Sequence, residues 1–131
     1  IQAQVLDLLR NLKDKINSSI MLITHDLGVV AEMADYVVVM YAGRVVEKGT
    51  AREIFKDPRH PYTKALLKSL PSNRGEKLET IKGQPPTLSQ QINGCKFHPR
   101  CECCTDICTR EVPQLKDIGL SHACACFVVG N

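Results

Sequence analysis

Cysteine is the residue type in this chain whose number and spacing most clearly point to chemistry. Five of the seven cysteines fall in residues 95–108, and the last two follow soon after, whereas the first 94 residues contain none. Cys101 and Cys104 have C-x-x-C spacing, and Cys108 lies four residues further on, which is acceptable for a four-thiolate zinc site. A disulfide framework is typical of small secreted chains with an even cysteine count, and free thiols would leave the clustering unexplained. The pattern therefore favours a metal or cluster site.

The stretch that carries these cysteines differs in composition from the residues before it. From residue 72 onward Gly, Pro, Ser and Gln become frequent and apolar periodicity weakens. We therefore predict two domains, 1–71 and 72–131. The second has few large apolar residues, and small units of that kind usually need a metal, disulfides or a partner to fold. His98 and His122 lie near the cysteines and could act as ligands, but we predict them to be surface histidines.

A second candidate for chemistry is His25, which follows the apolar run 19–24. This run is rich in β-branched residues and lacks polar alternation, so it predicts a strand buried on both faces of a parallel sheet. Ligands bind beyond the carboxyl ends of such strands, which is where His25 would lie. The alternative is a histidine that only caps or packs at the end of the strand.

The elements around His25 can be predicted from periodicity and capping residues. Steps of three and four place one apolar face on an opening helix, made of Ile1, Val5, Leu8, Leu9, Leu12 and Ile16. Asp26 is a plausible N-cap for a short second helix. The runs 35–41 and 44–49 predict a hairpin that turns at Ala42 and Gly43.

Two further helices are expected after the hairpin. Thr50 and Glu53 have the spacing of a capping box, which would open a helix that ends before Pro58. Pro61 can occupy the first turn of the next helix, which Pro71 would end.

Bulk composition excludes several classes of protein. The 131 residues carry a net charge of only +3, which gives no case for nucleic-acid binding. No apolar run approaches the roughly 20 residues that a membrane span needs, so direct membrane insertion is not expected. No secretory signal pattern is visible, and a soluble intracellular chain is the default expectation. The chain opens inside an amphipathic helix without an initiator Met, so we expect a fragment.

The stretch from Ile20 to Leu67 resembles the C-terminal half of an ABC-transporter ATPase domain. The resemblance lies in a strand, Thr-His-Asp, a helix, Ala-Asp-x-Val-x-Val-Met, Gly-Arg-Val-Val-Glu-x-Gly and a helix with Ile-Phe. It implies that His25 is the switch histidine, which contacts the γ-phosphate of ATP bound with Mg in the complete protein. An imidazole there would donate a hydrogen bond where phosphoryl charge develops.

The stretch HPYTKALLKSLP narrows the resemblance. With the later Gly-Cys and Pro-Arg-Cys segments, it is similar to the C-terminal extension of the ATP-binding subunits of dipeptide and oligopeptide importers. That extension carries four cysteines that can hold an iron–sulfur cluster, which match Cys95, Cys101, Cys108 and Cys126. Cys103, Cys104 and Cys124 are extra cysteines that could replace or compete with these ligands, and zinc stays the alternative metal.

The expected fold class is α/β: the C-terminal part of an ABC ATPase domain, with a short parallel strand, a hairpin and helices, followed by an irregular cysteine-rich tail. The resemblance implies an ATPase subunit that energises peptide import at the cytoplasmic face of a bacterial or archaeal membrane, with permease subunits and a second ATPase subunit as partners. The chain has no G-x-x-x-x-G-K-[ST] phosphate loop, signature segment or Walker B strand, so we expect the fragment itself to be inactive. The alternative is a free-standing metal- or iron–sulfur-binding module without ATP chemistry.

Overall fold

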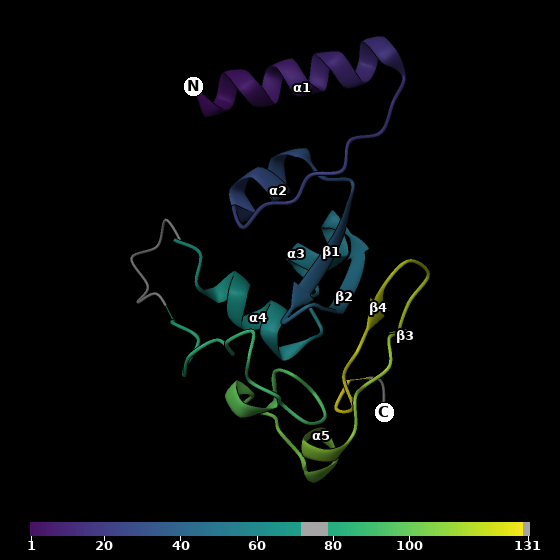
Figure 1. The fold of residues 1–131 in the computed structure, drawn as a ribbon. Coiled ribbons are helices and arrows are strands. Elements are labelled where there is room, and N and C mark those ends of the chain that lie inside the picture. Colours follow the sequence, from purple (N-terminus) through teal and green to yellow (C-terminus); the bar gives the residue numbers. More distant parts are fainter. Residues whose placement is uncertain (72–78, 130–131) are drawn as a thin grey trace. The chain divides into compact units, whose positions relative to one another are not determined.

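The computed structural model describes residues 1–71 and 79–129, and it divides into two compact units. The N-terminal unit comprises Ile1–Asp35 and the C-terminal unit comprises Tyr36–Asn131 (Figure 1). The domain boundary predicted between residues 71 and 72 stays a prediction. In the structure, strands from both sides of that position pair in one sheet.

The N-terminal unit consists of the helices α1 (Gln2–Ile16) and α2 (Leu27–Met33), both as predicted. Helix α1 ends at Asn17, whose left-handed backbone (φ 46°) is a common helix stop. The Asp26 carboxylate caps α2 by accepting hydrogen bonds from the backbone N–H groups of Gly28 and Val29, which confirms the predicted cap.

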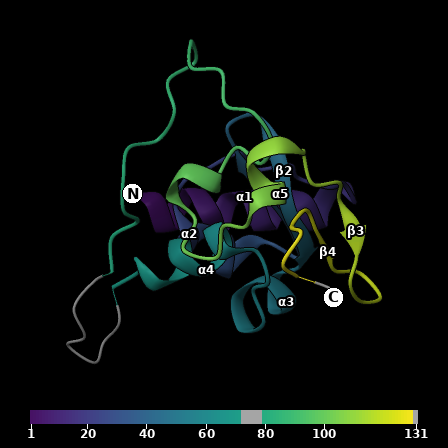
Figure 2. The ribbon, with the colours of Figure 1, turned by 90° about the horizontal axis from the view of Figure 1, so that it is seen from below.

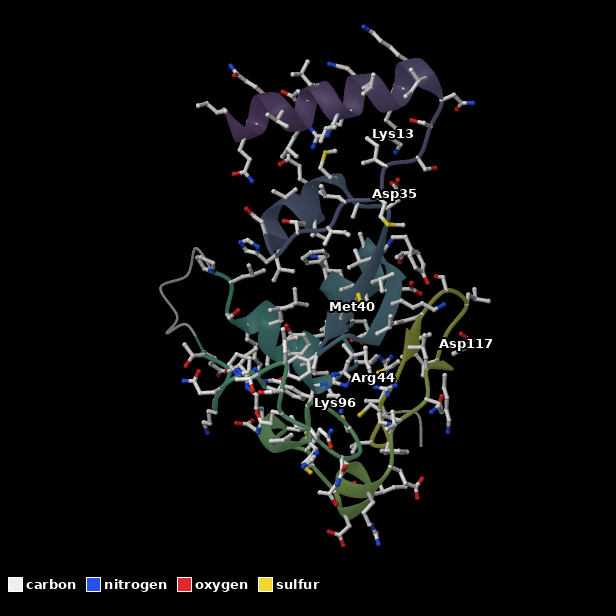
Figure 3. All side chains as sticks on the ribbon, in the orientation of Figure 1. Lys13, Asp35, Met40, Arg44, Lys96 and Asp117 are labelled. Carbon is white, nitrogen blue, oxygen red and sulfur yellow. The ribbon has the colours of Figure 1, made fainter. Side chains whose placement is uncertain are left out.

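Two ion pairs accompany these helices. Arg10 on α1 contacts Glu32 on α2 at 2.8 Å. The Lys13 side chain points toward Asp35 (Figure 3), and its Nζ lies 3.3 Å from Asp35 Oδ2. All four side chains are largely exposed, so each pair is worth little in stability.

The strand predicted at residues 19–24 is not formed. These residues have no regular secondary structure, and Met21 and Ile23 are at least 90% exposed. A strand exists only through hydrogen bonds to a neighbouring strand, and no strand among the described residues pairs with this segment. The predicted buried parallel strand is therefore not shown.

The C-terminal unit is built on a four-stranded antiparallel sheet with the order β1-β2-β4-β3. Strands β1 (Tyr36–Tyr41) and β2 (Arg44–Thr50) form the predicted hairpin. Ala42 (φ 47°) and Gly43 (φ 77°) make its turn, in which both central residues need a positive φ. Strands β3 (Lys116–Asp117) and β4 (Ala123–Cys124) come from the tail, and β4 pairs with β2.

Helices precede and follow the strands of this sheet, and local sequence explains where the first two of them begin. Helix α3 (Ala51–Lys56) opens with the predicted capping box of Thr50 and Glu53. Helix α4 (Pro61–Lys68) begins at Pro61, and the ring of His60 caps it. The tail adds the 3-10 helix η1 (His98–Arg100) and α5 (Asp106–Arg110). None of the helices in the described ranges has the length and apolar character needed to cross a membrane.

The core of the C-terminal unit joins the hairpin to the tail. Its buried members are Val39, Tyr41, Val46, Ile54 and Phe97. The Phe97 ring meets Tyr41 edge-on with centroids 5.2 Å apart, and it lies 5.4 Å from Tyr62. Figure 2 shows β3 and β4 at one side of this unit. The tail is thus less irregular than predicted, because Phe97 and β4 tie it to the sheet.

Candidate functional site

The structure gathers the predicted cysteine ligands around one small pocket in the C-terminal unit. The pocket is lined by Cys95, Cys101, Cys103, Cys108, Cys126, His60, Pro61, Phe97, His98, Pro113, Phe127 and Val128. All four cysteines implied by the resemblance are among them, together with Cys103. Of the three extra cysteines, Cys103 lines this pocket, whereas Cys104 and Cys124 do not.

Gly94 allows Cys95 to approach Cys108. Its positive φ of 67° suits glycine, and a Cβ there would overlap the Cys108 carbonyl oxygen and lie 2.8 Å from the Thr109 carbonyl carbon. The Cys95 N–H donates to that Cys108 oxygen at 2.8 Å. The backbone at Gly94 thus fixes two of the candidate ligands side by side.

A tight turn places Cys101 relative to Cys95. The His98 N–H donates to the Cys95 carbonyl at 3.0 Å, and the Cys101 N–H donates to the His98 carbonyl at 3.2 Å. The His98 ring Nδ1 also lies 2.9 Å from the Cys95 carbonyl oxygen. His98 is half-buried and borders the pocket, so its predicted surface position is only partly correct.

Arg100, which precedes Cys101, contacts the core rather than the pocket. Its guanidinium donates to the carbonyls of Lys82 (3.0 Å) and Gly83 (3.3 Å) and to the Tyr41 hydroxyl (3.2 Å). The Arg100 guanidinium therefore links the segment 81–83 to Tyr41 of β1.

Burial disfavours the thiolate form of Cys95, Cys101 and Cys124. Desolvation raises the pKa of Cys101 to about 11 and that of Cys124 to about 12, and it also raises the pKa of Cys95. Thiolate is the form that binds metals, so a cation would have to displace these protons on binding. Within the described ranges, no three His, Cys, Asp or Glu side chains converge closely enough to hold a metal ion. The ligand set stays a prediction.

His25 lies in the N-terminal unit, where its side chain is exposed. It sits between Thr24, whose hydroxyl accepts a hydrogen bond from the Asp26 N–H at 3.0 Å, and Asp26 itself, the N-cap of α2. This local turn fixes the backbone at His25. Its role as a switch histidine stays a prediction.

Sequence reasoning missed the buried polar residues of the C-terminal unit. Glu47 is 0% exposed, and His60 and His122 are 1% and 4% exposed. The prediction that His122 is a surface residue is wrong, because its Nε2 contacts Glu47 at 2.6 Å. The available signal was a charged residue directly after the two valines Val45 and Val46 of β2.

Comparisons with known proteins find the same family that the sequence motifs indicated. Residues 46–108 match the family described as "Oligopeptide/dipeptide transporter, C-terminal region". The chain is 46% identical over 97% of its length to a putative peptide import ATP-binding protein of Brucella melitensis, covering 40% of that protein. It is 49% identical over 98% of its length to an oligopeptide transport ATP-binding protein of Bacillus subtilis, covering 40% of it. It is 48% identical over 91% of its length to a dipeptide transport ATP-binding protein of Haemophilus influenzae, covering 37%.

Proposed function

Because this chain corresponds to the C-terminal region of peptide-importer ATP-binding subunits, we propose that it serves as that region in an ATPase that energises peptide import. The observation that carries the proposal is sequence identity of 45–49% across at least 91% of the chain to relatives named for peptide transport. The chain spans about 40% of the length of the first of these relatives. ATP with Mg would therefore be bound and hydrolysed by a longer subunit that contains this region.

The structure supports this proposal through the residues of the His-Pro-Tyr motif. The His60 ring accepts a hydrogen bond from the Tyr62 N–H at 3.0 Å, and Pro61 starts α4. The Tyr62 ring packs on Tyr41 with centroids 4.7 Å apart. Because the Tyr62 ring also lies 5.4 Å from the Phe97 ring, the motif connects the hairpin to the tail. We assign the whole region to the cytoplasmic face of a membrane, beside permease subunits and a second ATPase subunit.

A chimera tests the proposed function. This chain would replace the matching region of the Bacillus subtilis relative, and ATP-dependent peptide uptake would be measured in cells that lack the original subunit. Uptake should be retained, and it should be lost in a control chimera whose residues 36–129 are replaced by a flexible linker. A chimera that accumulates to normal levels and assembles with its partners, yet supports no uptake, would contradict the proposal.

His25 is proposed to contact the γ-phosphate in the complete subunit. A contact that strengthens in the transition state lowers turnover more than nucleotide affinity when it is removed. His25→Ala in the chimera should therefore abolish most ATP hydrolysis while leaving ATP binding largely intact. Lys15→Ala, an exposed change on α1, is the control. Turnover within about twofold of the unaltered chimera, or roughly 0.4 kcal/mol, would show that His25 has no such role.

Metal binding is the second proposed activity, and it is favoured by the shared pocket. We propose that Cys95, Cys101, Cys108 and Cys126 hold an iron–sulfur cluster, with zinc as the alternative. Soft thiolates suit both metals, but the side chains must move closer together than in the structure described here. The bound group would cross-link the tail.

Cysteine-to-serine variants made under anaerobic conditions test the metal proposal. Iron and sulfide should be lost on substitution of each of the four proposed ligands and retained in the Cys104→Ser and Cys124→Ser controls. Stoichiometric zinc without iron would favour the zinc site. Absence of both metals from anaerobically purified protein would contradict metal binding, and it would leave the transport proposal untouched.

A further inference from the structure

The turn between β3 and β4 inserts polar side chains toward the hairpin. The His122 Nε2–H donates to Glu47 Oε1 at 2.6 Å, and both residues are buried. Next to it, the Ser121 hydroxyl donates to Glu53 Oε2 at 2.9 Å, and the Ser121 carbonyl accepts from the Tyr36 hydroxyl at 3.1 Å. These three contacts join the tail to residues more than 60 positions earlier in the chain.

Glu47 is the centre of this contact. Besides the bond from His122, its carboxylate accepts from the backbone N–H groups of Arg59 at 2.8 Å and His60 at 2.9 Å. All three neighbours are donors, and an ionised carboxylate is the side chain that only accepts. One buried carboxylate therefore ties the tail, β2 and the start of α4 to one point.

The hairpin leaves room for the histidine at Gly49. A Cβ there would lie 3.0 Å from Glu53 Oε2 and 3.3 Å from His122 Cδ2, both tighter than ordinary contacts. The absence of a side chain at this position lets the imidazole and the Glu53 carboxylate sit against β2. The site is thus complementary in shape as well as in hydrogen bonding.

Among the described residues, the backbone pairing between β4 and β2 is short. Its register with β2 covers only two residue pairs, Glu47 with Cys124 and Lys48 with Ala123. One further backbone bond runs from the Ala125 N–H to the Val46 carbonyl at 2.8 Å. A strand of two residues is marginal by itself, so the polar side-chain contacts of the turn add to the attachment that β4 gains from burial and from its pairing with β3.

We propose that Ser121 and His122 are a latch that inserts into a socket of Glu47, Gly49 and Glu53, and that this latch holds β4, with the buried Cys124, against the hairpin. Glu47 accepts the hydrogen bond from the His60 N–H and is also the strand partner of Cys124 in β4. His122 is therefore a positioning residue for β4. It acts without a metal and without nucleotide, so the proposal does not rest on the function proposed above.

Thiol alkylation of the whole chain tests the latch. The reduced protein, treated with a chelator, is reacted with iodoacetamide, and the rate at each cysteine is followed by mass spectrometry. Cys124 is 3% exposed and reacts only when the tail opens, whereas Cys103 and Cys104 are exposed and serve as internal references. The ratio of these rates reports local opening.

His122→Leu fills the socket with an apolar side chain and removes the hydrogen-bond donor to Glu47. Alkylation of Cys124 should then accelerate on the order of tenfold, the change that a loss of about 1.4 kcal/mol produces, while Cys103 and Cys104 are unchanged. His122→Gln, whose amide nitrogen can still donate, should show a smaller increase. Leu120→Ala lies in the same turn with a fully exposed side chain and should change nothing.

Two results would overturn the latch. One is a Cys124 rate in His122→Leu that stays within about twofold of the original. The other is an increase that affects buried Cys108 as strongly as Cys124, because that pattern means general unfolding. Ser121→Ala guards against a His122 variant that fails to fold, since it removes only the exposed bond to Glu53. It should raise the Cys124 rate by a smaller factor with an unchanged circular-dichroism spectrum, and equal rates at Cys124 before and after the change would count against the proposal.

Discussion

The two units of this chain use apolar residues in opposite ways. In the N-terminal unit most of the predicted apolar face of α1 is exposed, with Leu8 at 67% and Ile16 at 60%. In the C-terminal unit the hairpin buries Val39 and Val46 against Phe97 of the tail. The apolar side chains of α1 are thus mostly exposed, whereas those of the hairpin are buried in the core of the C-terminal unit. The contrast teaches that periodicity identifies a face that can be buried, whereas burial itself depends on what lies opposite.

The largest expected effect comes from shortening one apolar side chain in each unit and comparing the two losses of stability. Phe97 is 3% exposed and contacts Tyr41 and Tyr62, so Phe97→Ala should destabilise the C-terminal unit by about 3–5 kcal/mol. Leu8→Ala removes a mostly exposed side chain and should change stability by no more than about 0.5 kcal/mol. Urea unfolding followed by far-ultraviolet circular dichroism measures both. Equal effects of the two changes would break the contrast.

A second test uses pH, because buried polar groups occur in the C-terminal unit. Burial lowers the pKa of His60 to about 4, below its unfolded value near 6.5, so the folded state takes up this proton less readily. Stability from this residue is complete above pH 6.5 and is lost as pH falls toward 4. The full loss is on the order of 3 kcal/mol. Denaturant titrations between pH 4 and 7 should show this slope.

His60→Asn is the control for the pH test. Asparagine is a good helix cap and does not titrate, so the variant should keep α4 while flattening the pH dependence between 4 and 6.5. An unchanged slope in the variant would assign the acid sensitivity to other groups. The comparison separates the capping role of His60 from the cost of burying its ring.

The local elements of both units were predictable because their signals are local. Asp26, the Thr50–Glu53 box and Pro61 each act on backbone groups within a few residues, and each prediction is confirmed. The strand at 19–24 was not predicted correctly, because strand pairing depends on a distant segment that a local pattern cannot identify. For the same reason nothing in the tail sequence predicted that β4 would join the hairpin.

The candidate site was predictable in part. Cysteine spacing and the family resemblance indicated a common site, and four of the indicated thiols do line one pocket. The roles of Glu47 and His122 could not be predicted, because a buried hydrogen bond between residues 75 positions apart leaves no local pattern. A fully buried glutamate in a strand, such as Glu47, should prompt a search for distant donors.

A third, smaller test compares two glycines with positive φ. At Gly94 a Cβ would clash with the backbone of Cys108 and Thr109, so Gly94→Ala should cost about 1–3 kcal/mol from overpacking in addition to the left-handed strain. At Gly43 nothing lies within 4 Å, so Gly43→Ala should show only the strain, about 1–2 kcal/mol. Urea midpoints give the difference. It should be accompanied by altered reactivity of Cys95 in the Gly94 variant alone, and identical behaviour of the two variants would show that the close approach at Cys108 does not matter.

The smallest expected effect compares the helix caps of the two units. Thr50→Ala removes one half of the capping box of α3, whose residue Ile54 is 2% exposed in the core, so it should lower the unfolding free energy of the C-terminal unit by about 1 kcal/mol. Asp26→Ala removes the equivalent bonds to Gly28 and Val29 of α2, but little apolar surface is buried there. We expect faster amide hydrogen exchange in α2 and no shift in the unfolding midpoint of the C-terminal unit, because a poorly buried helix frays locally before it unfolds with its neighbours. A loss of protection that spread from α2 into β1 and β2 would show that the two units unfold together, and the contrast between them would then be one of exposure alone.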